Sequence, residues 1–199
     1  MNLFVEDSTM KHHRELARNI RNFKYERSEH GIVVPSMGLI VGGTLTHWLN
    51  GEDPQHEENL ITTEGLNHML ETVLDTSGTR VTQWYVAVYG GSASAGLTGD
   101  NFNTNASEFT TEYDEATRPQ YDLSAATATG GSISNSANKA DFTFNTGATV
   151  TGAAIVSWSS KSDGSGTDRC FAAADFGSSR SVVDDDVLTI QYTVTIANS

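Results

Sequence analysis

Cysteine and positive charge are both scarce in this sequence of 199 residues. Its 1 cysteine, Cys170, excludes an intramolecular disulfide and a cysteine-rich zinc site. Lysine and arginine together number 12 against 25 aspartates and glutamates, so the formal net charge is −13. Nucleic-acid phosphate is bound through a basic surface, and a chain this acidic is therefore a poor nucleic-acid partner.

Long apolar runs are also missing. No stretch reaches the roughly 18 apolar residues that a membrane-spanning helix needs. The first residues lack the apolar centre of a signal peptide and carry His12, His13 and Arg14 instead. We therefore expect a soluble chain that is made in a reducing compartment and is not exported by the usual route.

The residues that are abundant favour strands and tight turns. There are 18 glycines but only 3 prolines, and charged residues make up only 19% of the chain. The clearest strand is the last, where Leu188, Ile190 and Tyr192 share one face and polar residues alternate with them. Similar patterns occur at 81–89, 148–158 and 170–176. Short strands at this spacing predict a mainly β fold, a β-sandwich or jelly roll.

One helix is expected in this β body, over residues 64–75. Its apolar residues recur at helical spacing and form a stripe of Leu66, Met69, Leu70, Val73 and Leu74. Thr63 is placed to cap the start of the helix. We expect the stripe to be buried against a flank or open end of the sandwich, so that Leu70→Ala would cost about 2–5 kcal/mol.

Charge divides the chain into regions. Residues 1–30 hold 6 of the 12 cationic residues and have a net charge of +1, which leaves −14 for the remainder. We expect an N-terminal arm over 1–30, helical or extended. A β hairpin or connector follows over 31–62, with a turn at Asn50-Gly51. The β-sandwich domain with its helix then covers 63–199.

The arm contains the candidate docking site. Three apolar residues recur there at helical spacing, and three arginines lie close to them in the sequence. So narrow an apolar stripe does not stabilise an isolated helix, so the arm either packs on its own domain or anchors the chain to another protein. The candidate partner-docking residues are Arg14, Leu16, Arg18, Ile20, Arg21 and Phe23.

Motifs for catalysis or metal binding are incomplete. Asn101, Asn103 and Asn105, with Glu112 farther on, imitate a calcium loop, but alanine stands at position 106 where that loop needs glycine. No phosphate-binding loop, nucleophile elbow or dinucleotide fingerprint occurs. We therefore expect no catalytic residue, no metal and no cofactor, and a structural or binding role.

Two weaker functional alternatives rest on particular side chains. Glu108 and Glu112 are an acid pair of the kind a glycosidase uses. Tyr113, Tyr121 and Trp158 are candidate aromatic platforms for a glycan. For Trp158, as for Trp84 and Tyr85, packing in the core is the favoured interpretation.

Several stretches of the sequence resemble a family of tailed-bacteriophage virion proteins over roughly residues 37–199. They are 59–70 (NLITTEGLNHML), 82–89 (TQWYVAVY), 107–109 (SEF), 116–119 (ATRP), 131–137 (GSISNSA), 142–144 (FTF) and 182–188 (VVDDDVL). In the last of these the family more often has glycine where this chain has Asp185. Proteins of this family are known mainly as structural components of virions, and the resemblance implies no catalytic residues.

The resemblance implies a non-enzymatic virion component, assembled in the bacterial cytoplasm and docked by its arm on other virion proteins. A short tail fibre, or an accessory protein of the neck or tail, is the leading interpretation, and a homo-oligomer is expected. The partners would be portal, adaptor, tail or major capsid proteins. A capsid decoration or cement protein is the alternative, and a host-glycan-binding module is a further one. Neither nucleic-acid binding nor membrane insertion is expected.

Overall fold

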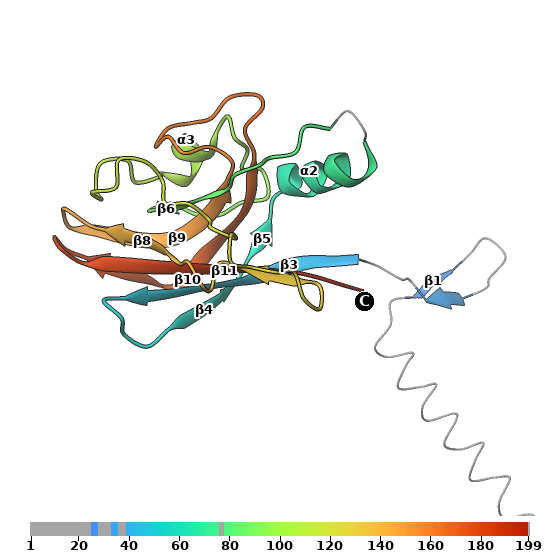
Figure 1. Ribbon diagram of the computed structural model, residues 1–199, viewed down its shortest axis with the longest axis horizontal. Helices are drawn as coiled ribbons and strands as arrows, with labels where there is room; N and C mark the ends of the chain where they lie inside the picture. Colours follow the sequence, from blue (N-terminus) through green and yellow to red (C-terminus); the bar gives the residue numbers. More distant parts are fainter. Residues whose placement is uncertain (1–24, 28–32, 36–38, 76–77, 199) are drawn as a thin grey trace, which may run out of the picture. The chain divides into compact units, whose positions relative to one another are not determined.

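The computed structural model describes residues 25–27, 33–35, 39–75 and 78–198 (Figure 1). The chain divides into two compact units, Met1–Ile40 with Ala197–Ser199, and Val41–Ile196. In the first unit β1 (Tyr25–Arg27) and β2 (Val33–Pro35) pair antiparallel. The six expected docking residues at positions 14–23 lie outside the described residues.

The second unit is built on two sheets. One sheet has the order β5-β10-β9-β6, from Leu60–Ile61, Cys170–Val182, Ala148–Val156 and Tyr85–Tyr89. The other has the order β4-β3-β11-β7, from Gln55–Glu58, Leu39–Leu49, Val187–Asn198 and Ser132–Ser134. β8 (Ala140–Thr143) also pairs with β11. Two helices accompany them, α2 (Thr63–Leu74) and α3 (Phe102–Ala106).

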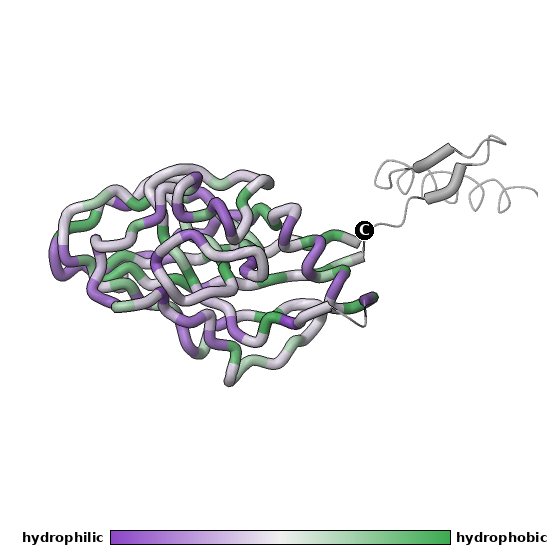
Figure 2. Tube along the Cα trace, turned by 90° about the horizontal axis from the view of Figure 1, so that it is seen from above, coloured by the Kyte–Doolittle hydropathy of each residue, from purple (hydrophilic) through white to green (hydrophobic). Residues whose placement is uncertain are grey.

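The predicted fold class is confirmed, because the body is mainly β and its two antiparallel sheets pack as a sandwich (Figure 1). The predicted alternation of β11 is also found, with Leu188, Ile190 and Tyr192 fully buried. These three residues share a core with Leu45 of β3 and Ile155 of β9, so side chains from both sheets meet between them. Along the trace, hydrophobic and hydrophilic residues alternate over short distances, as two-faced strands require (Figure 2).

The four-stranded sheet is covered on its second face as well. Successive residues of a strand point to opposite faces, and in β9 Ile155 belongs to the core between the sheets while Ala154 belongs to a second cluster. That second cluster includes Phe102 of α3 and the free thiol of Cys170, both fully buried. α3 therefore covers this sheet from outside the sandwich.

The region expected to be a connector, residues 31–62, contributes β3, β4 and β5 to the two sheets. The predicted turn follows β3, where Asn50 and Gly51 have φ of 52° and 74°. The Asn50 side chain also bridges to the loop between β10 and β11. It donates to Asp186 at 2.7 Å and accepts from the Val187 N–H at 2.8 Å. In that loop Asp185 has φ of 68°, a conformation that glycine adopts most readily.

The predicted helix is present as α2, but its expected packing is wrong. Its N-cap is Thr62 rather than Thr63. Four of the five residues of the apolar stripe are exposed, at 42% for Leu66, 58% for Leu70, 78% for Val73 and 75% for Leu74. α2 lies beside β5 at the margin of the sandwich (Figure 1) and contacts β10 through a different face.

Candidate functional site

α2 is attached to the sheet edge by its N-terminal turn and by its smallest residue. Thr62 donates its hydroxyl to the Cys170 carbonyl of β10 and accepts from the Gly65 N–H at 2.9 Å, which caps the helix. A Cβ on Gly65 would lie 2.2 Å from the Phe171 carbonyl oxygen, so only glycine permits this approach. His68, one turn farther on, packs edge-on against Trp84 with ring centroids 5.7 Å apart.

This attachment leaves an apolar surface of α2 that no described residue covers. We call Leu66, Leu70, Val73 and Leu74 the α2 face. These four residues belong to one helix and follow helical spacing, so they form one patch rather than scattered surface residues. An exposed contiguous apolar patch is typical of an interaction site.

The electrostatics of α2 is one-sided. The helix and its C-cap carry three acids, Glu64, Glu71 and Asp75, and no lysine or arginine, although Glu64 accepts from the Cys170 N–H at 2.6 Å and lies 3.9 Å from the Arg169 guanidinium. Its last turn, which holds Val73 and Leu74, has no basic residue to balance the negative end of the helix dipole. A partner of α2 would therefore best combine apolar side chains with positive charge.

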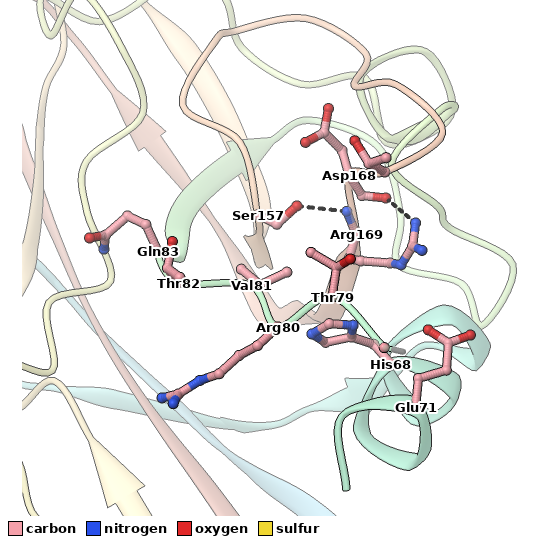
Figure 3. Close-up of a pocket in the computed structure, with 12 residues that line it drawn as sticks. His68, Glu71, Thr79, Arg80, Val81, Thr82, Gln83, Ser157, Asp168 and Arg169 are labelled. Carbon is pink, nitrogen blue, oxygen red and sulfur yellow. Dashed lines mark hydrogen bonds between the residues drawn. The ribbon is translucent and has the colours of Figure 1, made fainter. Parts of the chain in front are cut away.

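A polar pocket of about 440 Å³ lies beside α2 (Figure 3). Its wall is formed by α2, the segment 78–83 and the ends of β9 and β10. The Ser157 hydroxyl accepts from the Arg169 N–H at 2.7 Å, and the Arg169 guanidinium donates to the Asp168 carbonyl at 3.0 Å (Figure 3). The Arg80 side chain extends away from the other labelled residues in this view.

The pocket is lined by hydrogen-bonding and titratable side chains, among them His68, Glu71 and Asp168. Burial lowers the pKa of His68, and the nearby Arg169 lowers it further, which favours the neutral imidazole. The lining contains no tryptophan, tyrosine or phenylalanine on which a sugar ring would stack. The pocket suits a small polar ligand, and nothing in its geometry selects one.

Glu108, one of the two acids considered for a glycosidase, is buried and held internally. Arg118 donates to both of its carboxylate oxygens, at 2.6 Å and 2.5 Å, and Asn103 donates to it at 3.0 Å. Burial raises the pKa of Glu108, while the bonds from Arg118 and Asn103 act in the opposite direction. Glu112 accepts from the Thr110 and Thr111 N–H groups of its own loop. The structure thus gives both carboxylates local partners and does not present them as a free pair.

The three aromatic residues considered as glycan platforms are all buried, which corrects that expectation. Tyr113 is 2% exposed, Tyr121 4% and Trp158 7%. Tyr113 packs edge-on against Phe142, and Tyr121 donates its hydroxyl to the Tyr192 carbonyl at 3.0 Å. The favoured alternative, that Trp158 packs in the core, is confirmed.

The sequence that imitates a calcium loop folds as α3 and its flanks. Asn101 accepts from the Thr98 N–H at 2.9 Å, and Asn103 donates to Glu108, so two of the candidate side chains serve local contacts. Among the residues that the structure describes, no group of three or more His, Cys, Asp or Glu side chains is arranged to hold a metal ion. None of the described helices has the length and hydropathy that a membrane crossing requires.

Arg118 is the residue that sequence reasoning missed. It is 1% exposed and its guanidinium lies over the Trp158 ring, 4.3 Å from the centroid. It also donates to the Trp158 carbonyl at 3.0 Å. Arg118 lies in an irregular segment with no periodic pattern, and only its place in the ATRP stretch distinguished it.

No family model matches the chain, and no curated protein is similar to it.

Proposed function

We propose that this chain is a non-enzymatic structural component of a tailed-phage virion, and that the α2 face is one of its assembly contacts. The observation that carries the assembly role is the exposure of Leu66, Leu70, Val73 and Leu74 on one helix. Burying such a patch against a partner contributes about 25 cal/mol for each Å² of apolar surface removed from water.

The burial of Glu108 and of the Cys170 thiol supports a structural role over one that uses either group in catalysis. Glu108 is neutralised by Arg118, and burial raises the pKa of the Cys170 thiol, which keeps it in its unreactive form. The buried ion pair fixes α3 and the loop around Trp158 in one arrangement. A module of this kind is suited to being a rigid part in an assembly.

The place of the chain on the particle is proposed from its organisation. The arm over 1–30, with its candidate residues at positions 14–23, would dock the protein on portal, adaptor or tail proteins. The acidic body would then project outward, as a short tail fibre or neck accessory does. A capsid decoration protein would use the same two elements at many more sites. Quantitative mass spectrometry of purified virions distinguishes them, because a copy number near that of the major capsid protein contradicts the tail position.

The assembly role is tested by polar substitution on the α2 face. Leu70→Gln combined with Val73→Gln should leave a folded protein, since both side chains are more than half exposed, at 58% and 78%. We expect its incorporation into virions to fall at least tenfold. The matched control is Val183→Gln, an equally apolar and 59% exposed position in the loop after β10. Normal incorporation of the double variant would refute the role of the α2 face.

A host-glycan-binding module is a second proposal, supported only by the hydrogen-bonding groups of the pocket beside α2, whose lining has no tryptophan, tyrosine or phenylalanine for a sugar ring to stack on. Arg80, Thr82 and Gln83 of its lining can form hydrogen bonds with the hydroxyl and carboxylate groups of a sugar. A glycan array supports this candidate if binding is lost on Thr82→Ala and Arg80→Ala, and an array without a hit contradicts it.

A further inference from the structure

We infer that the α2 face binds the cationic segment 14–23 of a second copy of this chain. This inference rests on the proposed assembly role of the α2 face and names its partner; it assigns segment 14–23 to the contact between copies, in place of docking on portal, adaptor or tail proteins. Its starting point is that no described residue covers the α2 face, with Leu70, Val73 and Leu74 each more than half accessible. The cover for these side chains is therefore a segment outside the described residues, of the same chain or of a second copy, or another protein.

The acidic residues of α2 favour a binding partner with positive charge. Pairing of α2 with the α2 of another copy would bring together two helices whose only formally charged residues are acids, and like charges repel. Residues 25–199 have 7 cationic residues against 22 acids, so the body of a second copy offers little positive charge. Segment 11–24 is the exception, with 5 cationic residues against 1 acid.

The same segment carries the matching apolar residues. Leu16, Ile20 and Phe23 are spaced as one face of a helix, and Arg14, Arg18 and Arg21 lie between and beside them in the sequence. The α2 face has the complementary pattern of four apolar side chains, on a helix whose C-terminal end lacks a cation. An arginine near those last carbonyls would be stabilised by the helix dipole.

Such a contact is heterologous, because the arm of one copy binds the body of the next. Heterologous contacts close into rings or reciprocal dimers, or extend into chains. The contact also joins the two features that the sequence sets apart, the cationic arm and the acidic body. Electrostatic attraction then accelerates encounter and fixes orientation, while the apolar residues supply most of the affinity.

A complementation experiment with full-length chains tests the inference. One variant, Leu70→Gln with Val73→Gln, has a defective α2 face and an intact arm. The other, Ile20→Gln with Phe23→Gln, has the reverse. Sedimentation of the wild type should show self-association that weakens as salt rises, and each double variant alone should be monomeric. Their mixture should form a pair of twice the monomer mass, because one intact arm still meets one intact α2 face.

Each other outcome overturns the inference. A wild type that is monomeric at all concentrations means that the α2 face has a different partner or binds its own arm. Association that survives either double variant excludes the corresponding surface, and a mixture that stays monomeric indicates that like surfaces pair. Val183→Gln is the control and should associate as the wild type does. The result is independent of virion localisation, so a chain that associates in this way but is missing from virions would refute only the proposed function.

Discussion

The two helices α2 and α3 show how differently a helix can be attached to the same sheet. α3 has only five residues, yet Phe102 and Ala106 are fully buried beneath it and Arg118 lies over the Phe102 ring at 5.7 Å. α2 has twelve residues and the strongest helical periodicity of the described body, yet it buries only Gly65 and His68. α3 is therefore part of the core, whereas α2 is attached to its margin.

The difference shows that an apolar stripe in the sequence predicts a helix but does not predict what the apolar face of that helix packs against. At α3 the large side chain enters a space between Tyr89 and Trp158, with both rings edge-on to Phe102. At α2 the closest approach to β10 is at Gly65, which has no side chain, and beside it Glu64 accepts from the Cys170 N–H at 2.6 Å. The apolar stripe then lies on a face turned away from that contact.

The largest change in the free energy of unfolding should come from a substitution in α3. Phe102→Ala removes a fully buried ring and leaves a cavity against Tyr89 and Trp158, which should lower the free energy of unfolding by about 3–5 kcal/mol. Asn105→Ala, an exposed position on α3, is the matched control and should change it by about 0.5 kcal/mol or less. Equal effects of both changes in urea unfolding would mean that α3 is not anchored through Phe102.

The next effect should come from the attachment point of α2. Gly65→Ala places a methyl group against the Phe171 carbonyl and should cost about 1–3 kcal/mol, because backbone must shift to admit it. Asn67→Ala, an exposed neighbour on α2, should have little effect on the same urea curve. If Gly65→Ala were neutral, α2 would be loosely held along its whole length, and the two helices would differ even more in how firmly they are attached.

A smaller change in the free energy of unfolding should follow from lowering the pH, which protonates His68 where α2 packs against Trp84. The folded pKa of His68 is lowered below its ordinary value of 6.5 by burial and by Arg169, while Glu64 and Glu71 act in the opposite direction. Stability from neutral His68 is therefore complete above pH 6.5 and is lost as the pH falls through the lowered pKa. The wild type should lose more stability than His68→Gln between pH 7 and 5.

The position of this titration is measured by NMR of the His68 ring and by fluorescence of Trp84, which it contacts. His47 titrates lower in the folded protein, since burial lowers its pKa to about 4, and its own effect on stability is common to the wild type and His68→Gln. A His68 pKa at or above 6.5 would contradict the close contact between α2 and the sheet.

The smallest effect on stability should come from the α2 face itself. Leu70→Ala should change the free energy of unfolding by about 0.5 kcal/mol or less, rather than by the 2–5 kcal/mol that burial of the stripe would imply. A calorimetric scan of the dilute protein measures it. A large loss at low concentration would show that Leu70 is covered within the single chain and would remove the contrast between the helices.

The parts of the fold that could be predicted from sequence are those whose pattern is local. The alternation of apolar and polar residues predicted the inward face of β11, and Leu188, Ile190 and Tyr192 on that face are buried as expected. Asn50-Gly51 marked the turn after β3 because the φ values there suit few other residues. The candidate site was less predictable, since the exposure of Leu70 depends on which face of α2 meets β10.

Other features were beyond prediction because they depend on contacts between distant segments. α3 is too short to show a period, and its sequence resembled a metal loop. Arg118 is a cation in an irregular segment, and its burial follows from meeting Glu108, Trp158 and Ser162 at once. Such a site is defined by convergence in space, which no single stretch of sequence records.

The position of Cys170 has a consequence for how this protein can be followed in the laboratory. Its thiol is fully buried on β10, and burial raises its pKa. A thiol reagent should therefore modify Cys170 of the folded chain only when β10 opens. The rate of labelling then measures how often the four-stranded sheet unfolds locally. Since this is the only cysteine of the sequence, copies that associate in their folded state do so without covalent links between them.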